Sequence, residues 1–214
     1  MTVGAPGKAT LSLSLSLLNI FALFVVMVPG VQSLSPQVNG RLLLFILAKP
    51  LNPAQHLAAA AAATVITVAL GLLIISLAAF LLLLFHTPVS PLVFLAALWL
   101  TLLEAVLLTA FAALFSVLTS PTLASFLTLF IYVIGHSAEQ AMLIMAQSES
   151  FLRFPAVILA PLLPNLEFLN LKAALIQGLT PDPSYFLLSA IYVFSYAGLV
   201  FWVAVGTAAA GDKL

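Results

Sequence analysis

The chain has 214 residues, of which 64% are hydrophobic and only 6% are charged. Its six basic and six acidic side chains cancel, and its mean hydropathy is +1.28. Because roughly a quarter of a soluble domain is charged, this composition excludes a water-soluble globular protein and predicts that lipid covers most of the surface. The balanced charge gives no indication of a nucleic-acid partner.

The residue types available for catalysis and metal binding are few. The sequence has no cysteine, which excludes disulfides, thiolate metal ligands and a cysteine nucleophile. Its three histidines, His56, His86 and His136, are far apart in sequence and give weak support to a histidine metal site. We therefore expect no cofactor, and an enzyme is the least favoured class because no G-x-S-x-G motif is present.

Long apolar segments predict an all-α fold, a polytopic transmembrane helical bundle formed by residues 1–214 as a single domain. Each segment is long enough to cross a bilayer, and none alternates as the strands of a transmembrane barrel do. Prolines separate several of them, as expected where a helix ends or begins. The predicted spans, about five in number, are Leu11–Val31, Leu57–Phe85, Leu92–Leu118, Thr122–Ala146 and Tyr185–Ala210.

The connection over residues 32–56 predicts a helix on the membrane surface. Its apolar core, Leu42–Ala48, is too short to span, lies between Arg41 and Lys49, and is stopped by Pro50. A short amphipathic helix is the structure that such a pattern favours. The basic residues, without an acidic neighbour, put this segment on the cytoplasmic side.

The connection over residues 147–184 predicts a re-entrant or interfacial helical segment on the opposite face. It is apolar, but prolines and scattered charges leave no clean window long enough to span. Irregular backbone at membrane depth requires protein around it. We expect Pro155 and Pro164 to lie at helix starts or breaks.

Four short stretches follow one another in an order that matches a known family. They are Leu47–Leu51 (LAKPL), Phe115–Pro121 (FSVLTSP), Ile131–His136 (IYVIGH) and Leu163–Asn170 (LPNLEFLN). They resemble, in this order, the L-L-A-K/R-P-V-S-R, S-S-F-T-S-P, Y-V-I-G-H and L-P-N-L-E-x-F-N elements of ABC-2 type transporter permeases. The stretches look like those of permeases such as the one for nitrous-oxide-reductase maturation, and the resemblance covers about residues 20–214.

The resemblance implies a multi-pass permease of the cell inner (plasma) membrane. In that family the surface helix docks on a separate ABC ATPase subunit, and two permease copies form a dimer. The chain has no G-x-x-x-x-G-K-[ST] motif, so ATP hydrolysis would come from the separate subunit. The implied ATPase-coupling residues are Arg41, Phe45, Lys49 and Pro50, although Arg41 and Lys49 are alternatively ordinary interfacial anchors. The implied outer-loop residues are Asn165, Glu167 and Asn170.

The chain also departs from the family, which keeps a second function class open. It begins where the family's second span begins. Gln37-Val-Asn39 stands where the family has an acidic E-x-E, and Pro53 stands where it has an arginine. Both changes fall at the contact that would transmit ATPase motion. The alternative is a non-transporting structural membrane subunit of a larger complex, derived from such a permease.

The first predicted helix carries polar side chains that need partners. Without an upstream span, these side chains would face lipid or another chain, and lipid is the costlier surrounding for an amide. We therefore expect a partner along this helix, either a second permease copy or a foreign membrane subunit. The polar side chains are Ser12, Ser14, Ser16 and Asn19.

Glu104, His136 and Glu139 are the candidate intramembrane polar residues. Glu104 is central in its predicted span and should face protein. It is either a path-lining or helix-locking residue, or a protonated carboxyl group that forms a hydrogen bond to a neighbouring helix for packing. His136 and Glu139 lie one turn apart on one helix face. This pair favours a hydrogen-bonded brace near the outer face over a metal or proton-relay site, because two ligands do not define a metal site.

Overall fold

The computed structural model describes residues 5–35, 53–84, 91–147, 164–172 and 182–211. Within these ranges every regular element is a helix, and none is a strand. Four helical runs are long and apolar enough to cross a membrane. This confirms the expected all-α fold of membrane type and indicates a multi-pass protein.

The first helical run is nearly continuous but contains a wider turn. It comprises α1 (Ala5–Val25), the π-helical turn η1 (Val26–Gly30) and α2 (Val31–Leu34). Pro29 lies inside the turn. A proline lacks the N–H of a regular helix and its ring collides with the preceding turn, and a π-helical turn relieves both effects. The predicted span therefore exists and extends past both expected ends.

The remaining long helices share one start signal. They are α4 (Pro53–Leu84), α5 (Pro91–Leu118), α6 (Pro121–Gln147) and α9 (Pro183–Gly211). Each begins at a proline, whose fixed φ suits the first helical position and whose missing N–H would be unpaired there anyway. The four remaining predicted spans correspond to these helices.

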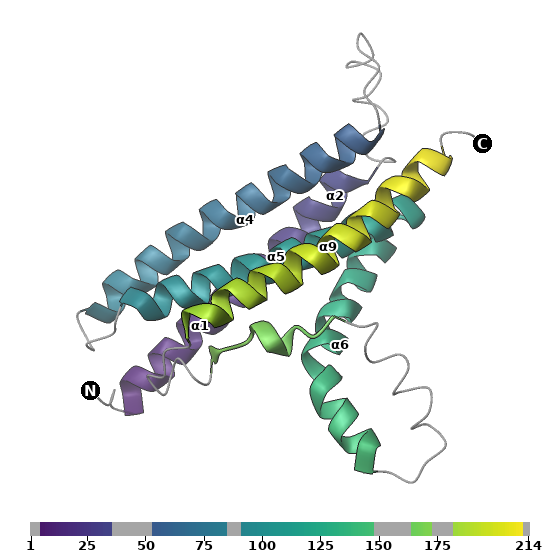
Figure 1. The fold of residues 1–214 in the computed structure, drawn as a ribbon. Helices are drawn as coiled ribbons and strands as arrows, with labels where there is room; N and C mark the ends of the chain where they lie inside the picture. Colours follow the sequence, from purple (N-terminus) through teal and green to yellow (C-terminus); the bar gives the residue numbers. More distant parts are fainter. Residues whose placement is uncertain (1–4, 36–52, 85–90, 148–163, 173–181, 212–214) are drawn as a thin grey trace.

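Helix α5 is the centre of the bundle. It packs against α1, α4, α6 and α9, and most of its residues are buried. Figure 1 shows α1, α4, α5 and α9 running along a similar direction, whereas α6 leaves the bundle at a steep angle. Four of the predicted spans meet the length and hydropathy of a membrane crossing, and the described apolar part of α6 is Pro121–Ser137.

Small and polar side chains bring α1 against its neighbours. Thr101 Oγ1 of α5 donates a hydrogen bond to Asn19 Oδ1, at 2.8 Å. A Cβ on Gly71 of α4 would lie 2.2 Å from the ring of Phe21, so the missing side chain permits close contact. The expectation that Asn19 faces lipid or another chain is therefore wrong, because α5 of the same chain supplies its partner.

Some predicted features lie outside the described residues. One of them is the surface helix about Gly40–Ala48. The implied ATPase-coupling residues also lie there, and they are Arg41, Phe45, Lys49 and Pro50. Of the connection 147–184, only 164–172 and 182–184 are described in full, and Pro155 is not among them.

Candidate functional site

Residues 164–172 form an irregular segment that lies against α6 and α9 and contains one short 3-10 helix, η3 (Glu167–Leu169). Leu166 donates its backbone N–H to the carbonyl of Gly135 in α6, at 3.1 Å. Asn165 donates its N–H to the hydroxyl of Tyr192 in α9, at 2.8 Å. The two consecutive residues Asn165 and Leu166 therefore attach the segment to two different helices.

The other half of the segment is held by α9 and α1. The Tyr185 hydroxyl donates to the carbonyl of Phe168. The Phe168 ring packs against the rings of Tyr185 and Tyr192, with centroids 5.1 and 5.8 Å apart. Lys172 Nζ donates to Ser16 Oγ on α1. Because helices contact it on several sides, the non-helical backbone has the protein shielding that a re-entrant segment requires.

A glycine on α6 permits this close approach. A Cβ on Gly135 would lie 2.6 Å from Leu166 Cγ and 3.0 Å from the carbonyl oxygen of Pro164. Real Cβ atoms do not approach carbon atoms so closely, so a larger residue would push the segment away. The next residue along α6 is His136, and the contact therefore determines what its imidazole can reach.

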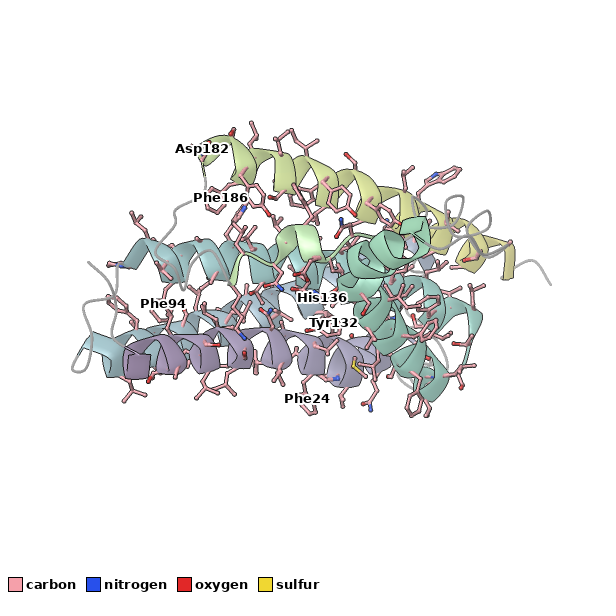
Figure 2. The ribbon with its side chains drawn as sticks, turned by 90° about the horizontal axis from the view of Figure 1, so that it is seen from below. Phe24, Phe94, Tyr132, His136, Asp182 and Phe186 are labelled. Carbon is pink, nitrogen blue, oxygen red and sulfur yellow. The ribbon has the colours of Figure 1, made fainter. Side chains whose placement is uncertain are left out.

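Three titratable side chains from three elements meet at this point. His136 Nε2 of α6 lies 2.8 Å from Glu104 Oε1 of α5. His136 Nδ1 lies 3.1 Å from Glu167 Oε2 of η3. We call these three residues the Glu–His–Glu cluster. Figure 2 shows His136 and Tyr132 where α6 meets η3 inside the bundle.

Burial across the Glu–His–Glu cluster is uneven. The Glu104 side chain is 6% exposed, that of His136 is 18% exposed and that of Glu167 is 33% exposed. Glu104 lies near the middle of α5, and Glu167 is the most exposed of the three side chains. Buried Glu104 confirms the expectation that this carboxylate faces protein instead of lipid.

Neighbouring side chains complete the hydrogen bonds of the cluster. Asn170 Nδ2 donates to both oxygens of Glu167, at 3.1 and 3.2 Å. Tyr132, one turn before His136, packs its ring edge-on to the imidazole with a centroid distance of 4.7 Å. Asn165 Oδ1 accepts the N–H of Phe168, which fixes the turn that carries Glu167. These hydrogen bonds hold Asn165, Glu167 and Asn170, the residues that the resemblance implies for the outer loop, in one compact segment.

A metal ion does not fit this arrangement. The imidazole lies between the carboxylates and uses both ring nitrogens to contact them, so the three groups point at one another instead of at a common centre. Among the described residues, no group of three or more histidine, aspartate or glutamate side chains could hold a metal ion. The cluster is therefore suited to hydrogen bonding and proton exchange.

The sequence predicted the members of this site but not their pairing. It grouped Glu104, His136 and Glu139 as intramembrane polar residues, paired His136 with Glu139, and put Glu167 in the outer loop. Glu139 lies on α6, beyond the residues whose side chains the structure describes. The contact with Glu104 also puts His136 at the level of the middle of α5, not near one face. The need of the mid-helix carboxylate Glu104 for a partner was recognised in the sequence, but nothing in the sequence identified His136 as that partner.

A small polar cavity lies on the far side of Asn170. Its volume of about 20 Å³ is the size of a single water molecule. Four of the side chains around it can form hydrogen bonds with water, and they are Asn19, Thr101, Asn170 and Lys172. A water there would have enough partners to be ordered.

Comparison of the chain with protein-family models, with curated proteins and with solved structures finds no match.

Proposed function

We propose that this chain is the membrane-spanning permease subunit of an ABC-type transporter, energised by a separate ATPase. The fold class required by this function is a multi-pass helical bundle, and the described helices form one. The proposal rests on the four stretches that resemble ABC-2 type permeases, and on how two of them are arranged in space.

The observation that carries the proposal is the contact between two of these stretches. Gly135 and His136 belong to the stretch Ile131–His136, and Leu166 and Glu167 belong to Leu163–Asn170. Although about 30 residues apart in sequence, the two stretches meet through the backbone hydrogen bond and the imidazole–carboxylate contact described above. Two of the stretches that carry the resemblance thus lie in direct contact, which supports the proposal.

A titratable cluster at the middle of a bundle also supports transport. An ionised carboxylate at that depth costs free energy unless it is paired. Such residues commonly mark a substrate or ion pathway. Glu104, near the middle of the central helix, is paired through His136.

The alternative function, a structural membrane subunit, has one observation in its favour. Both ring nitrogens of His136 and both oxygens of Glu167 have partners. A fully paired polar network stabilises one arrangement of a core, which is also what a structural brace needs. The two functions differ in their partner: the first requires an ABC ATPase and the second a larger assembly without one.

Purification of the tagged full-length chain in mild detergent tests the proposal. We expect an ABC ATPase in the eluate, held through the implied coupling residues. The double variant Arg41→Glu/Lys49→Glu should lose the ATPase, whereas Lys213→Glu, a matched charge reversal elsewhere, should keep it. A large assembly that contains no ABC ATPase would contradict the proposal and favour the structural subunit.

A further inference from the structure

We propose that the Glu–His–Glu cluster is a proton-binding site that exchanges one proton, with Glu167 as the entry group and Glu104 as the buried acceptor. The inference rests on the contacts, burial and charge of Glu104, His136 and Glu167. It does not depend on an ATPase partner, so it can be tested on the purified chain.

The number of protons in the cluster follows from its contacts. Each contact between a ring nitrogen and a carboxylate oxygen is a hydrogen bond only if one proton lies between the two atoms. The contacts at 2.8 and 3.1 Å therefore require two protons. The cluster then has a net charge of −1, either as an imidazolium between two carboxylates or as a neutral imidazole with one protonated carboxyl group.

A third proton removes the remaining charge without breaking a contact. With both carboxyl groups protonated and the imidazole neutral, Glu104 donates to Nε2 and Nδ1–H donates to the carbonyl oxygen of Glu167. All three groups are then uncharged. In a bundle surrounded by lipid, a net charge is unfavourable. These surroundings therefore favour the neutral form of the cluster more than water would.

The surrounding groups do not supply a compensating cation within the described part of the chain. Lys172, on the same segment as Glu167, donates to Ser16 instead of to a carboxylate. From α6, Tyr132 faces the imidazole with its ring. From α9, the hydroxyls of Tyr185 and Tyr192 are bonded to the backbone of the segment. The cluster therefore keeps its own charge or takes up a proton.

The uneven burial gives the exchange a direction. Glu167 is the most exposed of the three side chains and Glu104 the least. Because an imidazole can hold a proton on either nitrogen, it connects two groups that do not touch each other. We therefore assign Glu167 as the group that exchanges protons with the surroundings, and Glu104 as the group that receives its proton through His136.

The exchange is balanced in atoms and charge. Starting from the imidazolium form, the Nε2–H bond breaks as an O–H bond forms on Glu104. A hydronium ion then gives its proton to a Glu167 oxygen and becomes water. The imidazole keeps its proton on Nδ1 throughout, no electron is transferred, and the net charge of the cluster changes from −1 to 0.

Infrared difference spectroscopy on the purified full-length chain, labelled with ¹³C in its glutamate carboxyl groups, tests the proposal. On lowering the pH, we expect growth of the carbonyl band of a protonated glutamate. Glu104→Gln and Glu167→Gln should each lose part of this band. Asp182→Asn, which removes an exposed and unlabelled acid at the start of α9, should leave the band unchanged and controls for indirect effects of a substitution.

The relay through His136 has its own test. His136→Gln should remove the contribution of Glu104 to the band while leaving that of Glu167, because only Glu167 exchanges with water directly. If His136→Gln does not fold, the two glutamate variants still test whether the cluster takes up a proton. A wild-type band that does not change with pH, or two glutamate variants with the full wild-type amplitude, would overturn the proposal.

Discussion

The backbone N–H of Leu166 and the carbonyl oxygen of Gly135 lie 3.1 Å apart, in a hydrogen bond that joins an irregular segment to α6. A carbonyl inside a long helix normally accepts only from its own helix. Here the missing side chain of Gly135 exposes that carbonyl to a second donor. This contact sets the height at which Glu167 meets His136.

Replacing this glycine should destabilise the protein. A Cβ on Gly135 would lie 3.0 Å from the carbonyl oxygen of Pro164, a backbone atom that cannot rotate away. We expect Gly135→Ala to lower stability by about 1–3 kcal/mol, the usual cost of overpacking. Thermal unfolding in detergent, followed by circular dichroism, measures the change.

Gly198→Ala on α9 is the matched control for that substitution. A Cβ on Gly198 would meet no neighbouring atom within 4 Å, and alanine favours a helix over glycine by roughly 0.5–1 kcal/mol. Gly198→Ala should therefore be neutral or stabilising. Equal melting temperatures for the two variants would show that the contact of Gly135 does not matter.

Removing the buried carboxylate should be costly only when its hydrogen bond is also lost. Glu104→Ala leaves the Nε2 of a partly buried imidazole without its partner, and breaking a buried pair in this way costs about 3–5 kcal/mol. Glu104→Gln keeps an oxygen in the same place and should cost much less. Unfolding temperatures of the two variants provide the comparison, and a glutamine as damaging as the alanine would disprove the pairing.

The hydrogen bond between Asn19 and Thr101 should couple α1 to α5. Interhelical hydrogen bonds in membranes are worth about 1 kcal/mol. In a double-mutant cycle, we expect Asn19→Leu and Thr101→Val to interact by roughly that amount. Thr67→Val is the control, because Thr67 bonds to the carbonyl of Ala63 on its own helix. Additive effects of Asn19→Leu and Thr101→Val would mean that the bond contributes nothing.

The positions of the long helices could be predicted from the sequence because they depend on local properties. Apolar runs as long as a bilayer is thick identify helices, and the prolines at positions 53, 91, 121 and 183 mark their starts. The π-helical turn has a local cause in Pro29, although the sequence predicted one uninterrupted span there. The steep direction of α6 depends on packing against other helices and leaves no pattern in the local sequence.

The cluster could be predicted only in part, for a similar reason. Glu104 stood out because a carboxylate within an apolar helix needs a partner, and His136 stood out as a polar residue in the next helix. Helical spacing suggested Glu139 as the partner of His136. The observed partners come from α5 and η3, and such contacts depend on the tertiary fold, which spacing along one helix does not encode.

The partner expected along α1 remains a prediction, now on different grounds. Leu13, Leu17, Ile20 and Phe24 form an exposed apolar stripe on this helix, with 66%, 58%, 60% and 60% of each residue exposed. The resemblance to dimeric permeases favours a second copy against it. Since the chain has no cysteine, single-cysteine variants give unambiguous crosslinks.

We expect Leu17→Cys and Phe24→Cys to form disulfide-linked dimers when membranes are oxidised. Leu199→Cys, at a position 68% exposed on α9, should stay monomeric and serves as the control. Gel electrophoresis without reductant measures the dimer. Dimers from Leu199→Cys alone would place the partner on α9 and contradict the prediction.

ATP hydrolysis by the complex purified with this chain, measured after reconstitution in liposomes, tests the central claim most directly. The proposed permease function requires that the complex hydrolyse ATP. Glu104→Gln should lower the rate without changing assembly, whereas Asp182→Asn should not. A complex without ATP hydrolysis, or one whose rate Glu104→Gln leaves unchanged, would contradict the account and leave the cluster as a structural brace.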